Sequence, residues 1–147
     1  MDRGMAVVLT AIVGGFIALQ APINSVLGKQ IGTFQAAFLS FALGTIVLAL
    51  IAGLVKDGLG TIGAARELPW YYLTGGLLGA LYVTTVLVTV RSLGAGGVVA
   101  ATITGQLTLS VLADHFGWLG VERDPAGAAK LLGVVLLGVG TFLVVRE

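Results

Sequence analysis

The chain has 147 residues, of which 57% are hydrophobic and only 10% charged, and its net charge is +1. A soluble domain of this length cannot bury so much apolar surface, and soluble proteins carry nearer a quarter charged residues. The composition therefore predicts an integral membrane protein. The small net charge gives no sign of nucleic-acid binding, and a chain without cysteine cannot form disulfides, thiolate metal sites or a cysteine nucleophile.

Charged residues lie between or near the ends of long apolar stretches, and these stretches locate the membrane spans. We expect an all-α fold, a single membrane domain over residues 1–147, with five transmembrane helices of roughly the 20 residues that cross a bilayer core. The expected helices cover about 5–28, 33–55, 69–90, 96–116 and 126–145. Thr33 is expected to cap the second helix, and Asp124, followed by Pro125, the fifth.

The odd number of spans places the two termini on opposite faces of the membrane. Of the Lys and Arg residues, five would lie on the N-terminal face and three on the other, a weak bias that permits insertion in either orientation. One chain with five spans cannot contain a complete inverted repeat, whereas two copies in opposite orientations would supply one. This arithmetic predicts an antiparallel, dual-topology dimer that forms a ten-helix inverted-repeat transporter.

The first expected helix carries amides inside its span. Gln20 and Asn24 share a face, and Pro22 between them cannot donate a hydrogen bond to the Ala18 carbonyl, so a helix kink is expected there. A broken backbone flanked by polar side chains indicates a membrane binding site. The alternative is that the amides bond neighbouring helices as structural contacts.

The second and third expected helices add few polar groups. Ala36, Ser40 and Gly44 recur every four residues and predict a helix-packing surface. Tyr82 lies at mid-span, where its phenol needs a polar partner, so it is a candidate cavity residue. Threonines of the third helix, such as Thr85, are expected to bond their own backbone.

The fourth expected helix bears a polar seam at successive steps of four: Thr102, Gln106, Ser110 and Asp114. Such spacing keeps the side chains on roughly one face. Gln106 and Ser110 repeat the pattern of Gln20 and Asn24, and all four could line one polar cavity. Asp114 and His115 are candidates for proton coupling, against the alternative of interfacial side chains that reach water.

The sequence predicts no enzyme, because no base stands beside a serine, and it predicts neither a metal nor another cofactor. Because no acidic residue lies at mid-membrane, the expected solute is neutral-polar, zwitterionic or anionic rather than a permanent cation. Four aromatic residues at span ends are expected to form a belt on one side of the membrane. They are Trp70, Tyr71, Tyr72 and Trp118.

Three stretches carry a family resemblance: QAPINSVLG at Gln20–Gly28, RSLGA at Arg91–Ala95 and GQLTLSVLADHFG at Gly105–Gly117. With them the chain resembles the YdcZ family of bacterial inner-membrane proteins, within the drug/metabolite transporter superfamily. The resemblance implies a multi-pass inner-membrane transporter of small solutes that assembles as an antiparallel dimer, either of identical chains or with a paired homologue. It also implies that six residues occupy the family's polar motif: Gln20, Asn24, Gln106, Ser110, Asp114 and His115.

The leading hypothesis is a secondary transporter, an exporter, in the lipid bilayer. A small polar solute would bind at midplane between helices one and four of two opposed subunits, with alternating access. The binding residues would be Gln20, Asn24, Gln106, Ser110 and Tyr82. The alternatives are a dual-topology channel and a non-transporting structural or partner subunit.

Overall fold

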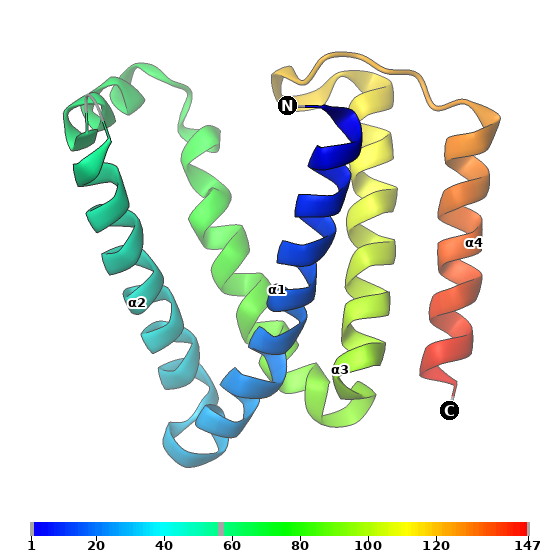
Figure 1. Ribbon diagram of the computed structural model, residues 1–147, viewed down its shortest axis with the longest axis horizontal. Helices are drawn as coiled ribbons and strands as arrows, with labels where there is room; N and C mark the ends of the chain where they lie inside the picture. The colour runs from blue at the N-terminus through cyan, green and yellow to red at the C-terminus, as the bar shows by residue number, and fades with distance from the viewer. Residues whose placement is uncertain (1, 56–57, 147) are drawn as a thin grey trace. The chain divides into compact units, whose positions relative to one another are not determined.

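The structure is a computed structural model that describes residues 2–55 and 58–146. These residues contain no strand, which confirms the all-α fold (Figure 1). Its elements in order are α1 (Arg3–Ile31), α2 (Thr33–Leu54), η1 (Gly58–Glu67), η2 (Trp70–Thr74), α3 (Gly75–Phe116), η3 (Trp118–Gly120) and α4 (Ala128–Val145). The chain divides into two compact units, Met1–Arg91 and Ser92–Glu147.

Four helical stretches of the described chain are long and apolar enough to cross a membrane. The third runs over Trp70–Phe116 and has 47 residues, about twice the length that a bilayer core requires. Within it the backbone leaves the helical conformation at Gly94, with φ 66° and ψ 171°. The third and fourth expected helices are therefore the two halves of α3, and the described residues hold five apolar segments.

Glycine explains where α3 breaks. The backbone angles of Gly94 fall in a region that is essentially restricted to glycine. The sequence predicted a loop between residues 90 and 96, whereas helical structure continues up to and beyond Gly94. The third expected helix also starts differently, because Trp70–Thr74 forms a 3₁₀ turn and the α-helix begins at Gly75.

In the first unit, α1 and α2 form a tight hairpin. Gly32 makes the turn with φ 102°, and its N–H bonds to the Gly28 carbonyl at 3.0 Å. A Cβ added at Gly28 would lie 3.7 Å from the Ala36 Cβ, so the two helices approach closely there. The predicted Thr33 cap is wrong: Gly32 is the N-cap of α2, and no side chain caps it.

The core of the first unit lies between α2 and the first half of α3. Ala36 and Ala37 of α2 pack against Val83 and Leu87 of α3, and Leu87 is only 1% exposed. Tyr82 packs against the edge of this core. The small alanine side chains allow the helices to come together, and the same stretch of α3 forms one wall of the candidate site.

In the second unit, the second half of α3 is joined to α4 by hydroxyl groups. The Oγ1 atoms of Thr104 and Thr141 are 2.6 Å apart, and the Thr141 hydroxyl donates to the Ala100 carbonyl at 2.9 Å. The predicted Asp124 cap is wrong, because α4 begins at Ala128 with Gly127 as its N-cap. The Asp124 carboxylate instead pairs with Lys130 at 2.5 Å.

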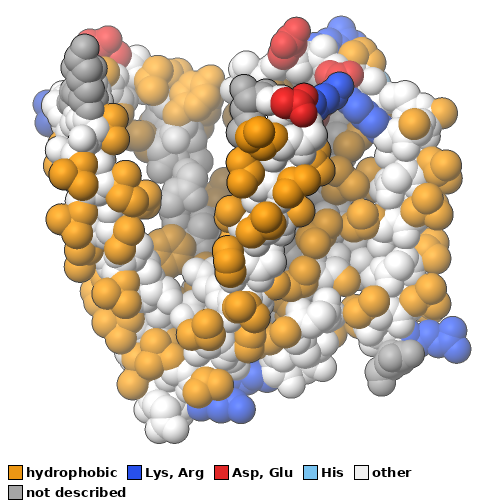
Figure 2. Space-filling model, in the orientation of Figure 1, with side chains coloured by type: hydrophobic (Ala, Val, Ile, Leu, Met, Phe, Trp, Pro, Cys, Tyr) orange, Lys and Arg blue, Asp and Glu red, His pale blue; other side chains and the backbone are white. Residues whose placement is uncertain are grey.

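Apolar side chains cover the outside of the helices along their lengths, and charged side chains gather at the helix ends (Figure 2). Phe16, Phe38 and Leu54, for example, are 68%, 71% and 88% exposed. In water such surfaces would be strongly unfavourable, whereas a bilayer solvates them. The aromatic belt stays a prediction, since Trp118 belongs to a different unit from Trp70, Tyr71 and Tyr72.

Candidate solute site

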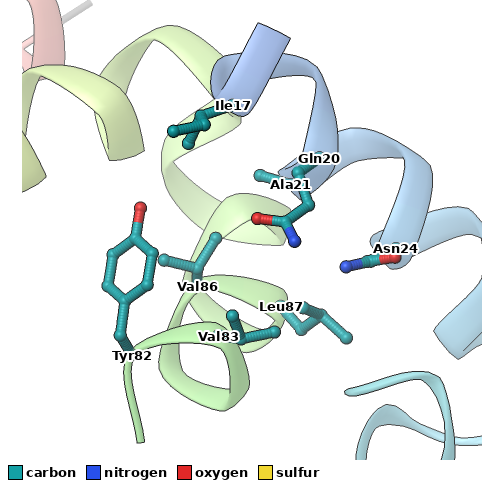
Figure 3. A pocket seen from close by; sticks show the side chains of 8 residues that line it. All are labelled: Ile17, Gln20, Ala21, Asn24, Tyr82, Val83, Val86 and Leu87. Carbon is teal, nitrogen blue, oxygen red and sulfur yellow. The ribbon is translucent and has the colours of Figure 1, made fainter. Parts of the chain in front are cut away.

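A hollow lies between α1 and the first half of α3, entirely within the first unit (Figure 3). We call it the α1–α3 hollow. Its cavity volume is about 10 Å³, roughly the space of one water molecule, and it is partly open to the outside. Its lining residues are Ile17, Gln20, Ala21, Asn24, Tyr82, Val83, Val86 and Leu87. The structure thus brings three of the sequence-predicted site residues together, namely Gln20, Asn24 and Tyr82.

Asn24 is the most constrained polar residue of this hollow. Its side chain is only 5% exposed, and its Oδ1 accepts a hydrogen bond from Ser40 Oγ on α2 at 2.7 Å. Its Nδ2 is buried and has no hydrogen-bond partner among the described residues. A buried donor without a partner costs about 1–3 kcal/mol. One end of the amide therefore serves helix packing, while the other end is without a hydrogen-bond partner among the described residues.

Gln20 and Tyr82 complete the polar part of the α1–α3 hollow. Figure 3 shows the Gln20 amide extending between Asn24 and Tyr82, and the nitrogen of Asn24 directed toward the Gln20 side. Tyr82 is half-buried and Gln20 is exposed. The other lining residues are aliphatic, and none of the described lining residues is charged. The hollow can hydrogen-bond a ligand, but it provides no ionic partner.

Ser40 was missed as a site residue, because its spacing with Ala36 and Gly44 indicated only packing. The expected backbone bonds are confirmed for Thr85 and Thr89, whose hydroxyls donate to carbonyls one turn earlier at 2.8 and 3.0 Å. Ser40 instead donates across the hairpin to Asn24. No sequence pattern distinguishes these two uses of a hydroxyl, since the choice depends on the acceptor that packing brings near.

Gln106 and Ser110 lie on the second half of α3, in the second unit, and both side chains are exposed. They do not line the α1–α3 hollow. That these two residues line one cavity with Gln20 and Asn24 stays a prediction. The kink at Pro22 also stays a prediction, because α1 is assigned as one helix from Arg3 to Ile31.

Asp114 and His115 hold the loop that follows α3. His115 Nδ1 accepts a hydrogen bond from the Ala126 N–H at 3.0 Å, and the His115 carbonyl accepts one from Arg123 Nε at 3.1 Å. The Asp114 carbonyl accepts from the Asp124 N–H at 2.9 Å. Because Nδ1 is an acceptor, neutral His115 carries its proton on Nε2. The proton-coupling role of this pair stays a prediction.

Within the described ranges, no group of three or more His, Cys, Asp or Glu side chains is placed to hold a metal ion. The α1–α3 hollow offers the amide groups of Gln20 and Asn24 and the phenol of Tyr82, and its other lining side chains are aliphatic.

The helical fold, with its span-length apolar segments and a polar hollow inside one of its units, places the chain among the polytopic α-helical membrane proteins. Residues 5–143 match the family model described as "Putative inner membrane exporter, YdcZ". The chain belongs to this family of inner-membrane exporters, which are transporters rather than enzymes. The resemblance and the inner-membrane location are thereby confirmed. Comparison with curated proteins and with solved structures gave no match.

Proposed function

We propose that this chain is a secondary transporter that exports a small polar, zwitterionic or anionic metabolite by alternating access. The observation that carries the proposal is the buried Nδ2 of Asn24, which has no partner among the described residues and lines the α1–α3 hollow. A purely structural amide would have both ends satisfied, because an unpaired polar group inside a span is costly. A solute that bonds Nδ2 would remove this cost.

The composition of the hollow supports the solute class. Its polar groups are two amides and a phenol, and the described lining residues include no carboxylate. A permanent cation inside a membrane needs a counter-ion, which these groups do not supply. Neutral, zwitterionic and anionic solutes can all bond to amide N–H and phenol O–H groups.

A second copy in the opposite orientation would complete the site. The cavity volume of the α1–α3 hollow, about 10 Å³, is far below the roughly 300–1,000 Å³ typical of small-molecule sites, so a solute would need space that a partner supplies. The exposed Gln106 and Ser110 are polar groups inside an apolar segment and need a cover of their own. An antiparallel homodimer, or a heterodimer with a paired homologue, would place these residues opposite Gln20 and Asn24.

Asp114 is our candidate for coupling proton movement to the switch between the two states. It is half-buried and lies two residues before the end of α3, where we expect the membrane interface. His115 is less suited, because its Nδ1 already accepts the Ala126 N–H.

The test begins with purified protein and a thermal-shift screen of small metabolites, since a ligand of the folded state raises the apparent Tm by mass action. Each binder is then loaded into proteoliposomes, and its flux is measured for the native chain, for Asn24→Ala and for the control Thr85→Val. We expect saturable flux that Asn24→Ala lowers at least tenfold and Thr85→Val leaves unchanged. Flux of thousands of solutes per second would indicate a channel, and no binding or flux for any metabolite would indicate a non-transporting subunit.

A further inference from the structure

The hydrogen bond between Ser40 and Asn24 sets the chemical character of the α1–α3 hollow. The Asn24 amide has an acceptor end, Oδ1, and a donor end, Nδ2. Ser40 Oγ donates to the acceptor end at 2.7 Å, and the donor end is buried and unpaired among the described residues. We infer that Ser40 orients this amide so that the site selects solutes that present a carbonyl or carboxylate oxygen to Asn24 Nδ2.

The orientation depends on where the Ser40 hydroxyl hydrogen goes. Thr85, Thr104 and Thr108 donate to the carbonyl four residues earlier in their own helix, at 2.8, 3.0 and 2.7 Å. Ser40 donates to Asn24 across the α1–α2 hairpin instead. With its hydrogen on Oδ1, the serine holds the amide in one of its two orientations, and the nitrogen faces the hollow (Figure 3).

The other polar groups of the hollow are adaptable. The Tyr82 hydroxyl can donate or accept, and the Gln20 amide can present either end by rotation. Asn24 is different because its acceptor end is already bonded, so only N–H is available to a ligand. A ligand group that has only donors, such as an ammonium, would meet N–H against N–H. A site built to pair one polar group strongly rejects analogues that lack the partner.

The inference rests on the proposed function, since it concerns the solute of the same hollow, but its test measures binding and not transport. The full-length chain is purified, placed in lipid nanodiscs and labelled with ¹⁵N in its asparagine side chains. It is titrated with three probes of one carbon skeleton: butyrate, butyramide and n-butylammonium. The readouts are the apparent Tm and the side-chain amide resonance of Asn24.

We expect at least one of the two oxygen-bearing probes to shift the Asn24 resonance and to bind at least tenfold more tightly than n-butylammonium. Ser40→Ala removes the group that holds Oδ1, so this preference should fall below about threefold. The matched change Ser92→Ala, at an exposed serine of the second unit, should leave the preference unchanged. Asn24→Asp replaces the donor by a carboxylate and should reverse the preference.

Two results would overturn the inference: n-butylammonium binding as tightly as both oxygen-bearing probes, or Ser40→Ala keeping the full preference. If Asn24→Asp fails to fold, the Ser40→Ala and Ser92→Ala comparison still decides, because neither serine is needed to fill the core. Selective binding without flux in proteoliposomes would contradict only the proposed transport. Flux of a solute without any oxygen acceptor would contradict only the selectivity inferred here.

Discussion

Arg91 Nη2 donates a hydrogen bond to Thr33 Oγ1 at 3.2 Å and so ties α3 to the first residue of α2. Gly28 of α1 lies beside this contact, because a Cβ at that position would be 3.6 Å from Arg91 Nη2, an ordinary van der Waals distance. Arg91, the last residue of the first unit, therefore helps to hold the turn between α1 and α2. Charge-assisted donors bond more strongly than neutral ones, although exposure of Arg91 weakens the effect here.

Removing this contact should destabilise the first unit. We expect Arg91→Ala and Thr33→Val each to lower the free energy of unfolding by about 0.5–1 kcal/mol. In a double-mutant cycle, measured by denaturant unfolding in detergent micelles, the two losses should not add, because both remove the same bond. Fully additive losses would show that the Arg91–Thr33 contact does not contribute to stability.

A side chain at Gly94 should strain the break in α3. Its φ of 66° and ψ of 171° are unfavourable for any residue with a Cβ. Gly94→Ala should therefore lower stability by about 1–3 kcal/mol, whereas Gly96→Ala, two residues on in helical backbone with nothing within 4 Å of an added Cβ, should be neutral or slightly stabilising. Thermal unfolding of both variants measures the two changes in stability. Equal losses for Gly94→Ala and Gly96→Ala would show that the break in α3 is not at Gly94.

The bond between the Ala126 N–H and His115 Nδ1 should hold the loop that follows α3. His115→Ala removes the acceptor, and a lost hydrogen bond of about 0.5–1.5 kcal/mol should make the Ala126 amide exchange several-fold faster. His115→Asn offers an oxygen near the same position and should keep most of the protection. Hydrogen exchange of the Ala126 amide, compared at one fixed pH, measures this, and unchanged exchange in His115→Ala would exclude the bond.

Thr141 should stabilise the second unit by linking α4 to α3. Its hydroxyl lies 2.6 Å from Thr104 Oγ1 and donates to the Ala100 carbonyl. Hydrogen bonds between membrane helices contribute about 0.6 kcal/mol each, up to about 1.7. Thr141→Val keeps the shape and should cost an amount in this range. The control Thr10→Val removes a bond within α1 alone and should cost less. Denaturant unfolding measures both losses, and a larger loss for Thr10→Val than for Thr141→Val would contradict a stabilising link between α3 and α4.

We expect Asn24 to support transport at a cost in stability. Asn24→Leu removes the buried unpaired donor and places an apolar side chain of similar size next to Leu87 and Val83, so the apparent Tm should stay equal or rise. Ser40 can then donate to its own helix, as Thr85 does. Transport in proteoliposomes should fall at least tenfold. A fall in both Tm and transport would mean that Asn24 is mainly a packing residue.

The sequence alone determined the all-α membrane fold, the apolar segments and the polar positions within them. These follow from local physics, since a bilayer demands long apolar stretches and helical periodicity assigns each residue to a face. It also carried the family motif at Gln20–Gly28 and Gly105–Gly117. The threonine bonds to their own backbone were predictable for the same reason, because donor and acceptor lie one turn apart in one helix.

Tertiary structure alone decided which polar groups meet and which stay free. The Asn24 amide is half-satisfied only because the hairpin brings Ser40 within 2.7 Å, a contact between residues 16 positions apart. In the same way, Asp124 accepts a hydrogen bond from Lys130 and does not cap α4, and the Thr33 hydroxyl accepts one from Arg91. Periodicity fixes the direction of a side chain but not its partner, because the partner depends on how separate helices pack.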